Sequence, residues 1–277
     1  MQLNKCFRAV SVLLVLMFCL TGRARTVVSL ETGEPIIYAS VGVINRNLGT
    51  VTDSLGNFSL SIPMTFIDDS VRISSVGYVA QTFAVRDLKS VPDTIRLADD
   101  AIALAEVVVK PGKIKRRIAG RKSGGGFITI DVENYKAAGQ GLAIPMKIKK
   151  LGWMREFGFF LRVNDYTLKH MKFRLNYYIK DGGSYRLVPG LKPIYFDYDI
   201  SQLDEKGQFR FVLPEEVILE KGDYYVEMEF LENFHDAIFD MPSKPMSGLT
   251  RYRYASQSEW ESFPFGAPIY MEYDSLE

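Results

Sequence analysis

Short runs of β-branched or alternating apolar residues, separated by turn-forming residues, occupy the first half of the chain. The clearest run lies between Gly49 and Leu60. Phe58 and Leu60 alternate there with polar residues, after a turn that contains Asp53 and Gly56. This stretch predicts a β-hairpin whose apolar side faces a core. Seven such runs in this half, without the period of a helix, predict an all-β sandwich.

Longer runs with a strict period of two follow in the second half. In residues 172–180, apolar side chains alternate with polar ones and with Tyr178. Residues 224–230 repeat the pattern, with Tyr225 on the polar side. Strands with one apolar and one polar face are typical of antiparallel sheets that are wet on one side. We therefore expect residues 127–277 to form a second antiparallel sandwich with a jelly-roll-like strand order, so that the whole chain is all-β.

Residues 1–24 have the composition of an export signal. Lys5 and Arg8 precede an apolar run, and small residues follow it. The run is shorter than the roughly 20 residues that span a bilayer, so it predicts a cleaved secretory signal peptide. Cys19 leaves a lipoprotein alternative open, although bulky residues precede it where small ones are usual. Because Cys6 and Cys19 are the two cysteines of the chain, we expect an exported mature protein without disulfides.

Several turn and strand motifs of the first half occur together with a specific spacing. They lie at residues 33–35, 49–58, 74–78 and 104–109. With these motifs, residues 25–109 resemble the carboxypeptidase-like regulatory domain, a transthyretin-like β-sandwich common in Gram-negative envelope proteins. The resemblance implies a location in the periplasm, at the outer membrane or at the cell surface. Such domains often precede the plug of TonB-dependent outer-membrane receptors, and an outer-membrane protein is therefore an expected partner.

The resemblance does not imply carboxypeptidase activity. A zinc carboxypeptidase needs a His-x-x-Glu pair and a further histidine, and neither His170 nor His235 has that spacing. Asp53 and Asn57 flank Gly56 and could be imagined as calcium ligands. However, such residues hydrogen-bond their own backbone in turns, and an EF-hand-type site needs several more oxygens. We expect no metal and no cofactor.

Residues 110–126 contain seven basic and no acidic residues. Pro111 and the glycines of this segment predict an irregular linker between the two sandwiches. Its charge leaves three alternatives open: packing against the acidic sandwiches, simple solvation, or peripheral contact with an anionic membrane through Lys115, Arg116 and Arg117. Nucleic acid is not an expected partner, because the chain is exported and no helix or aromatic platform accompanies the basic run.

Three aromatic residues of the second half are candidates for ligand contact. Tyr178 and Tyr225 fall on polar strand faces, and Trp260 lies in a segment expected to be a loop. Exposed aromatic rings can stack on sugar rings. We therefore take these three residues as a candidate site for a glycan or a peptide. The alternative is that these rings serve packing, as most Phe and Tyr residues of strands do. Residues 241–258 contain prolines, a glycine and several serines, which is typical of a loop at the rim of a site.

Enzyme motifs do not assemble in this sequence. It has no Gly-x-Ser-x-Gly turn and no glycine-rich phosphate loop, and it has two histidines to act as base or ligand. A carboxylate-pair glycoside hydrolase stays open as an alternative, since the spacing of two acids in space cannot be read from sequence. We expect a non-catalytic exported binding or assembly module of the cell envelope that contacts an outer-membrane partner protein or a surface polysaccharide. A structural adaptor without a small ligand is the other alternative.

Overall fold

The computed structural model describes residues 19–20, 24–100, 113–132, 138–181 and 184–276. Nearly all of its regular structure is strand, which confirms the all-β fold class. The chain divides into two compact units, Met1–Asp100 with Ser256–Ser258, and Ala101–Ala255 with Glu259–Glu277. The predicted leader and the last predicted strand of the first half fall almost wholly outside the described residues. Within the described ranges, no helix is long and apolar enough to cross a membrane.

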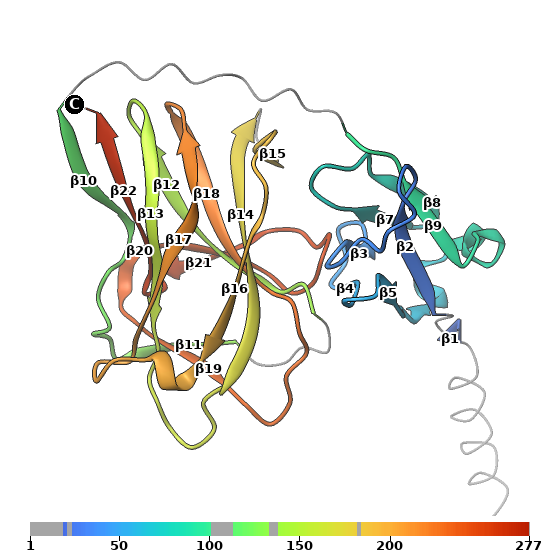
Figure 1. Cartoon of the computed structure of the whole chain (residues 1–277). Helices are drawn as coiled ribbons and strands as arrows, with labels where there is room; N and C mark the ends of the chain where they lie inside the picture. Colours follow the sequence, from blue (N-terminus) through green and yellow to red (C-terminus); the bar gives the residue numbers. More distant parts are fainter. Residues whose placement is uncertain (1–18, 21–23, 101–112, 133–137, 182–183, 277) are drawn as a thin grey trace, which may run out of the picture. The chain divides into compact units, whose positions relative to one another are not determined.

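The first unit contains two small sheets whose inner faces share one core, and β1 and β6 form a separate short pair (Figure 1). One sheet has the order β4-β3-β7-β8, and the other has the order β5-β2-β9 with β2 and β9 parallel. Val27 and Leu97 from one sheet meet Val41 and Ile73 from the other in this core. The elements are β1 (Cys19–Leu20), β2 (Arg25–Ser29), β3 (Ser40–Val43), β4 (Gly49–Val51), β5 (Asn57–Phe58), β6 (Ile62–Pro63), β7 (Ser70–Ser74), β8 (Gln81–Ala84), β9 (Thr94–Leu97) and the short 3-10 helices η1 (Met64–Phe66) and η2 (Val85–Ser90).

The prediction of a hairpin over residues 49–60 is wrong, although its turn forms as expected. Strand β4 pairs with β3, whereas β5 pairs with β2, so the two strands belong to different sheets. The side chain of Asp53 accepts hydrogen bonds from two backbone N–H groups of the turn, and Gly56 has a φ of +75°. The buried hydroxyl of Thr52 hydrogen-bonds the backbone of the segment before β3. Thr52 thus fixes the end of β4 to the sheet that contains β3. The turn that follows leads the chain to the sheet that contains β2.

The second unit is a sandwich of two antiparallel sheets (Figure 1). The smaller sheet has the order β10-β22-β13-β17, and the larger has the order β15-β14-β18-β12-β20-β21, with β16 also paired to β14. Strands β11 and β19 form a separate pair. The elements are β10 (Ile114–Gly120), β11 (Ile128–Val132), β12 (Gly141–Ile148), β13 (Gly152–Phe160), β14 (His170–Asp181), β15 (Ser184–Leu187), β16 (Ile194–Asp199), β17 (Gln208–Leu219), β18 (Gly222–Phe230), β19 (Phe239–Ser243), β20 (Pro245–Arg253), β21 (Glu261–Phe265), β22 (Ile269–Leu276) and the 3-10 helix η3 (Ile200–Gln202).

Aromatic rings dominate the core between the two sheets of the second unit. Phe159 of β13 lies with its ring centroid 4.8 Å from that of Phe209 and 5.1 Å from that of Phe239. Phe173 of β14 packs edge-on against Phe230 of β18 at 4.8 Å. The alternation predicted for residues 172–180 and 224–230 is confirmed, because the apolar positions of both strands enter this core. Their polar positions therefore lie on the outer face of the large sheet.

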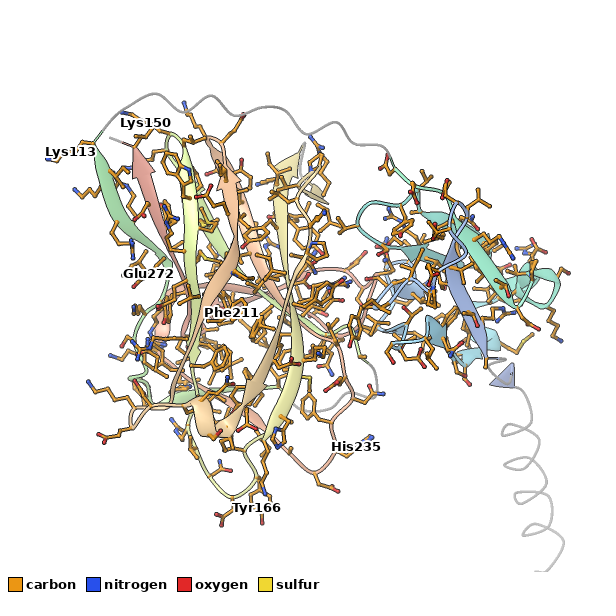
Figure 2. All side chains as sticks on the ribbon, in the orientation of Figure 1. Lys113, Lys150, Tyr166, Phe211, His235 and Glu272 are labelled. Carbon is orange, nitrogen blue, oxygen red and sulfur yellow. The ribbon has the colours of Figure 1, made fainter. Side chains whose placement is uncertain are left out.

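The basic segment differs from the expected irregular linker. Residues 114–120 form the edge strand β10, which pairs with β22 along its whole length. Arg116 donates hydrogen bonds to Asp274 Oδ1 at 2.6 Å and to Glu272 Oε2 at 3.3 Å, both on β22. Figure 2 labels Glu272 on that strand. A positively charged strand is thus held beside an acidic one, and the acidic partner lies about 160 residues later in the sequence.

Candidate functional site

The outer face of the large sheet carries charged and aromatic side chains in register. Three pairs lie opposite each other on β14 and β18: Arg174 with Glu229, Asn176 with Glu227, and Tyr178 with Tyr225. On the other side of β18, strand β12 presents small residues opposite the two glutamates and Pro145 opposite Tyr225. Gly141 lies opposite both Glu229 and Arg253, and Ala143 lies opposite both Glu227 and Arg251.

Two arginines and two glutamates form a buried network on this face. Glu227 and Glu229 are 0% exposed. Arg253 donates to Glu227 Oε1 at 2.6 Å and contacts Glu229 Oε1 at 3.0 Å, and Arg174 donates to Glu229 Oε2 at 2.6 Å. The amide of Asn176 donates to Oε2 of both glutamates at 2.8 Å. The charges balance, as buried ion pairs require.

Gly141 makes room for this network. A Cβ atom on residue 141 would overlap Oε1 of Glu227, the atom that accepts the hydrogen bond from Arg253. Arg253 stands on β20 and Glu227 on β18, with β12 between them. The side chains can therefore meet only because β12 carries no side chain at the crossing point.

The two carboxylates respond to this environment in opposite directions. Burial raises the pKa of Glu227, and the positive charge of Arg253 offsets this only in part. Burial would also raise the pKa of Glu229, but Arg174 and Arg253 together lower that pKa below its usual value. Tyr178 donates its hydroxyl to Glu227 at 2.9 Å, and burial followed by the nearby Glu227 charge raises the pKa of this phenol. Since both carboxylates are fully covered, this pair does not offer a substrate the acid and base of a glycoside hydrolase.

The three predicted aromatic residues all lie at this face, in two groups. Tyr178 packs edge-on against Trp260 at 5.7 Å, and the guanidinium of Arg253 lies 5.3 Å from the centre of the Trp260 ring. Tyr225 packs edge-on against Tyr185 of β15 at 4.7 Å. All four of these residues are half-buried.

Sequence reasoning missed Tyr185, Arg251 and Arg253. The arginines lie in the segment expected to be a loop, but Pro245–Arg253 is strand β20, paired with β12 and β21. The alternation of Arg251, Tyr252 and Arg253 could have predicted a strand here. Tyr252 packs against the core, and the two arginines lie on the opposite face. Arg251 lies over both rings of the second group, 5.0 Å from the centre of Tyr185 and 5.5 Å from that of Tyr225.

A small cavity of about 80 Å³ adjoins the network, and Gln140, Arg253 and Tyr254 contribute its polar wall. Sites for drug-sized ligands have volumes of roughly 300 Å³ or more, so this cavity has room for water or a very small molecule. A saccharide would have to contact the face of the sheet instead.

The three basic residues proposed for membrane contact differ in their position on β10 and in their neighbours on β22. Arg116 is paired to Asp274 and Glu272, whereas Lys115 and Arg117 alternate with it and lie opposite Ser275 and Tyr273. The hydrogen bond from Arg116, followed by that from Arg155, lowers the pKa of Asp274. The guanidinium of Arg116 therefore serves the strand pairing of β10.

Metal ligation finds no support in the geometry. Across the described ranges, no group of three or more His, Cys, Asp or Glu side chains is placed to hold a metal ion. Asp53 uses its carboxylate for the turn described above.

The geometry thus defines a two-unit all-β chain with a charged, aromatic sheet face. Residues 25–109 match the model of the CarboxypepD_reg-like domain family, which confirms the resemblance inferred from the motifs. The chain is 40% identical over 78 residues to the TonB-dependent receptor SusC of Bacteroides thetaiotaomicron. That match covers 28% of this chain and 7% of the receptor, so the chain spans a small part of this relative.

Solved structures give only distant similarities. The infectious bursal disease virus Gt strain structure matches with a TM-score of 0.22 and 9% identity, over 91% of this chain and 55% of that one. The VP2 subviral particle of infectious bursal disease virus matches with a TM-score of 0.17 and 10% identity, over 92% and 64% of the two chains. Similarity at this level carries no argument about this protein.

Proposed function

We propose that this protein is a non-catalytic, exported binding module of the cell envelope, and that the outer face of its large sheet binds a surface polysaccharide. The observation that carries the proposal is the gathering of Tyr178, Tyr225 and Trp260, with Tyr185, on one face of one sheet. The match of the first unit to the CarboxypepD_reg-like family, together with its similarity to a TonB-dependent receptor, supports the envelope setting.

The rings on this face are suited to a saccharide because they are held in place before a ligand arrives. The hydroxyl of Tyr178 is fixed by Glu227, and Trp260 is held between Tyr178 and Arg253. Sugar rings present apolar C–H faces that pack on aromatic rings, while phenol and indole groups offer polar contacts to the hydroxyls. Fixed side chains lose little conformational entropy on binding, which favours affinity on an open surface.

A second candidate function is assembly with an outer-membrane protein through the first unit. It is favoured by the match of residues 25–109 to the CarboxypepD_reg-like domain family and by the 40% identity, over 78 residues of the chain, to a TonB-dependent receptor. Co-purification from detergent-solubilised envelopes, with and without residues 25–109, would test this role separately from saccharide binding.

A glycan array probed with the full chain as the cell processes it tests the saccharide proposal. We expect binding to at least one bacterial surface glycan and a loss of about tenfold in affinity for Tyr225→Ala or Trp260→Ala, equivalent to about 1.4 kcal/mol. Tyr166→Ala is the matched control, because Tyr166 is 67% exposed on a loop outside this face (Figure 2). An array without any bound glycan, or equal binding by all variants, would overturn the proposal.

A further inference from the structure

We propose that the saccharide is negatively charged and that Arg251 is the residue that binds its anionic group. This inference rests on the proposed function and names the class of ligand for the same face. It begins from a contrast between two arginines of one strand.

Arg251 and Arg253 lie two residues apart on β20 and share the outer face of the sheet. Arg253 is matched by the carboxylates of Glu227 and Glu229. Arg251 has no carboxylate within ion-pair distance among the residues that the structure describes. Its described neighbours are Tyr185 and Tyr225: the guanidinium lies over both rings and hydrogen-bonds Tyr225, while its buried Nε atom has no hydrogen-bond partner.

The surroundings of Arg251 explain why its charge stays unmatched. Its neighbour in register on β12 is Ala143, and its neighbour on β21 is Ser262, so neither supplies a negative charge. Glu227, the acid in the same register row, is already bound by Arg253, Asn176 and Tyr178. The neighbouring strands therefore supply no free acid to this arginine.

Other charges around the tyrosine pair reinforce the excess of positive charge. Asp223, two residues before Tyr225 on β18, pairs with Lys147 at 3.7 Å. Lys180 is exposed and lies opposite Tyr185 in register, which adds a second cation beside the rings. Burial would raise the pKa of Tyr225, but its hydrogen bonds with Tyr185 and Arg251, followed by the charge of Arg251, lower it.

A guanidinium group that lies over aromatic rings has five in-plane N–H groups, so those of Arg251 that do not bond Tyr225 are available to a further partner. Carboxylate and sulfate oxygens accept such N–H groups in pairs, with charge-assisted hydrogen bonds that are stronger than neutral ones. The adjacent tyrosine rings would contact the sugar ring that bears the anionic group. A uronic acid or a sulfated sugar fits both requirements, whereas a neutral sugar satisfies only the second.

The test compares three oligosaccharides of matched length by isothermal titration calorimetry: an oligogalacturonate, a chondroitin sulfate fragment and a malto-oligosaccharide. We expect the full chain to bind at least one acidic probe more tightly than the neutral one, with affinity falling as salt rises. Arg251→Gln should weaken acidic binding by about tenfold, and it should weaken acidic binding more than neutral binding. Arg251→Lys should recover part of the loss, because it restores the charge without the paired geometry.

Arg210→Gln is the matched control, since it removes the same charge from an exposed position on β17 of the smaller sheet. Thermal unfolding of each variant checks that the fold is retained. Equal binding of acidic and neutral probes, unaffected by Arg251→Gln, would overturn this inference and leave the proposed function standing. Failure of every saccharide to bind would overturn both. The two acidic probes distinguish a carboxylate from a sulfate as the bound group.

Discussion

Arg253 places its Nε atom 2.6 Å from Oε1 of Glu227 although an entire strand, β12, runs between the two residues' strands. The contact crosses β12 above Gly141, which lies opposite both Glu229 and Arg253 and has no side chain. The outer face of the large sheet therefore depends on a long side chain, a buried acid and a glycine from three different strands.

Gly141→Ala should destabilise the second unit by about 3 kcal/mol. The added Cβ would overlap the carboxylate oxygen of Glu227 and separate it from Arg253, which leaves buried charges incompletely paired. Urea unfolding followed by circular dichroism measures the change. Gly125→Ala is the control, because a Cβ there meets nothing closer than 3.9 Å, and we expect it to change stability by less than about 0.5 kcal/mol. Equal stability of the two variants would contradict this account of the crossing point.

The two buried glutamates should give opposite contributions to the pH dependence of stability. The pKa of Glu229 is lowered in the folded state, so its stabilisation is present above the unfolded value of 4.5 and is lost as pH falls through the folded pKa. The pKa of Glu227 is raised, so the folded state holds this proton more tightly, and stability falls as pH rises from 4.5 through the raised pKa.

Urea unfolding between about pH 3 and pH 7 of the Gln variants tests these signs. Glu229→Gln should lower stability at neutral pH by about 3 kcal/mol and make the acid limb of the profile shallower. Glu227→Gln should remove a fall in stability above pH 4.5, because the contribution of the raised pKa of Glu227 is lost. Parallel profiles for both variants and the parent chain would show that neither carboxylate titrates as described.

The alternation of residues was enough to predict the faces of β14 and β18, because a period of two is a property of the strand itself. Phe173 was placed in the core and Tyr178 on the outer face for that reason, and both positions are confirmed. The burial of Glu227 was not predictable in this way. A strand with acids on its polar face predicts a solvated surface, and the burial of these acids depends on ion pairs with Arg253 from β20 and Arg174 from β14, which alternation along one strand does not reveal.

Pairing between distant segments accounts for the remaining differences. The turn at Asp53 and Gly56 has the chemistry expected of a hairpin, but local chemistry does not decide which sheet the next strand joins. Residues 114–120 have the composition of a linker, but they pair with β22 along their whole length, where Asp274 and Glu272 lie beside Arg116. The prolines and serines around β20 predicted a loop. The segment is a strand because it pairs with β12 and β21, and this pairing cannot be read from its own composition.

The ion pairs of Arg116 should hold the edge strand β10 in place. Arg116→Gln leaves Asp274 with Arg155 as its remaining cation, so we expect a loss of about 1 kcal/mol or less and faster amide exchange along β10. Exchange measured by mass spectrometry checks this. Lys150→Gln, which removes an exposed charge from the loop between β12 and β13 (Figure 2), should leave that exchange unchanged. Similar exchange of β10 in both variants would mean that backbone pairing alone holds the strand.

The same strand gives a test of membrane contact. Because the guanidinium of Arg116 is engaged by acids, Arg116→Ser should not reduce sedimentation of the protein with anionic vesicles. Lys115→Ser, which removes a charge from the preceding position of β10, is the comparison variant. A loss caused by Arg116→Ser and not by Lys115→Ser would assign the membrane contact to the paired arginine and contradict this expectation.

Tryptophan fluorescence should report the occupation of the sheet face. The chain has two tryptophans, and Trp153 on β13 is 8% exposed, whereas Trp260 is half-buried beside Tyr178 and Arg253. A saccharide that stacks on this face removes water from Trp260, so its addition should shift the emission to shorter wavelength. Trp153→Phe should retain the shift and Trp260→Phe should abolish it, while the phenyl ring keeps much of the packing against Tyr178. A shift that persists in Trp260→Phe and disappears in Trp153→Phe would place the ligand away from the outer face.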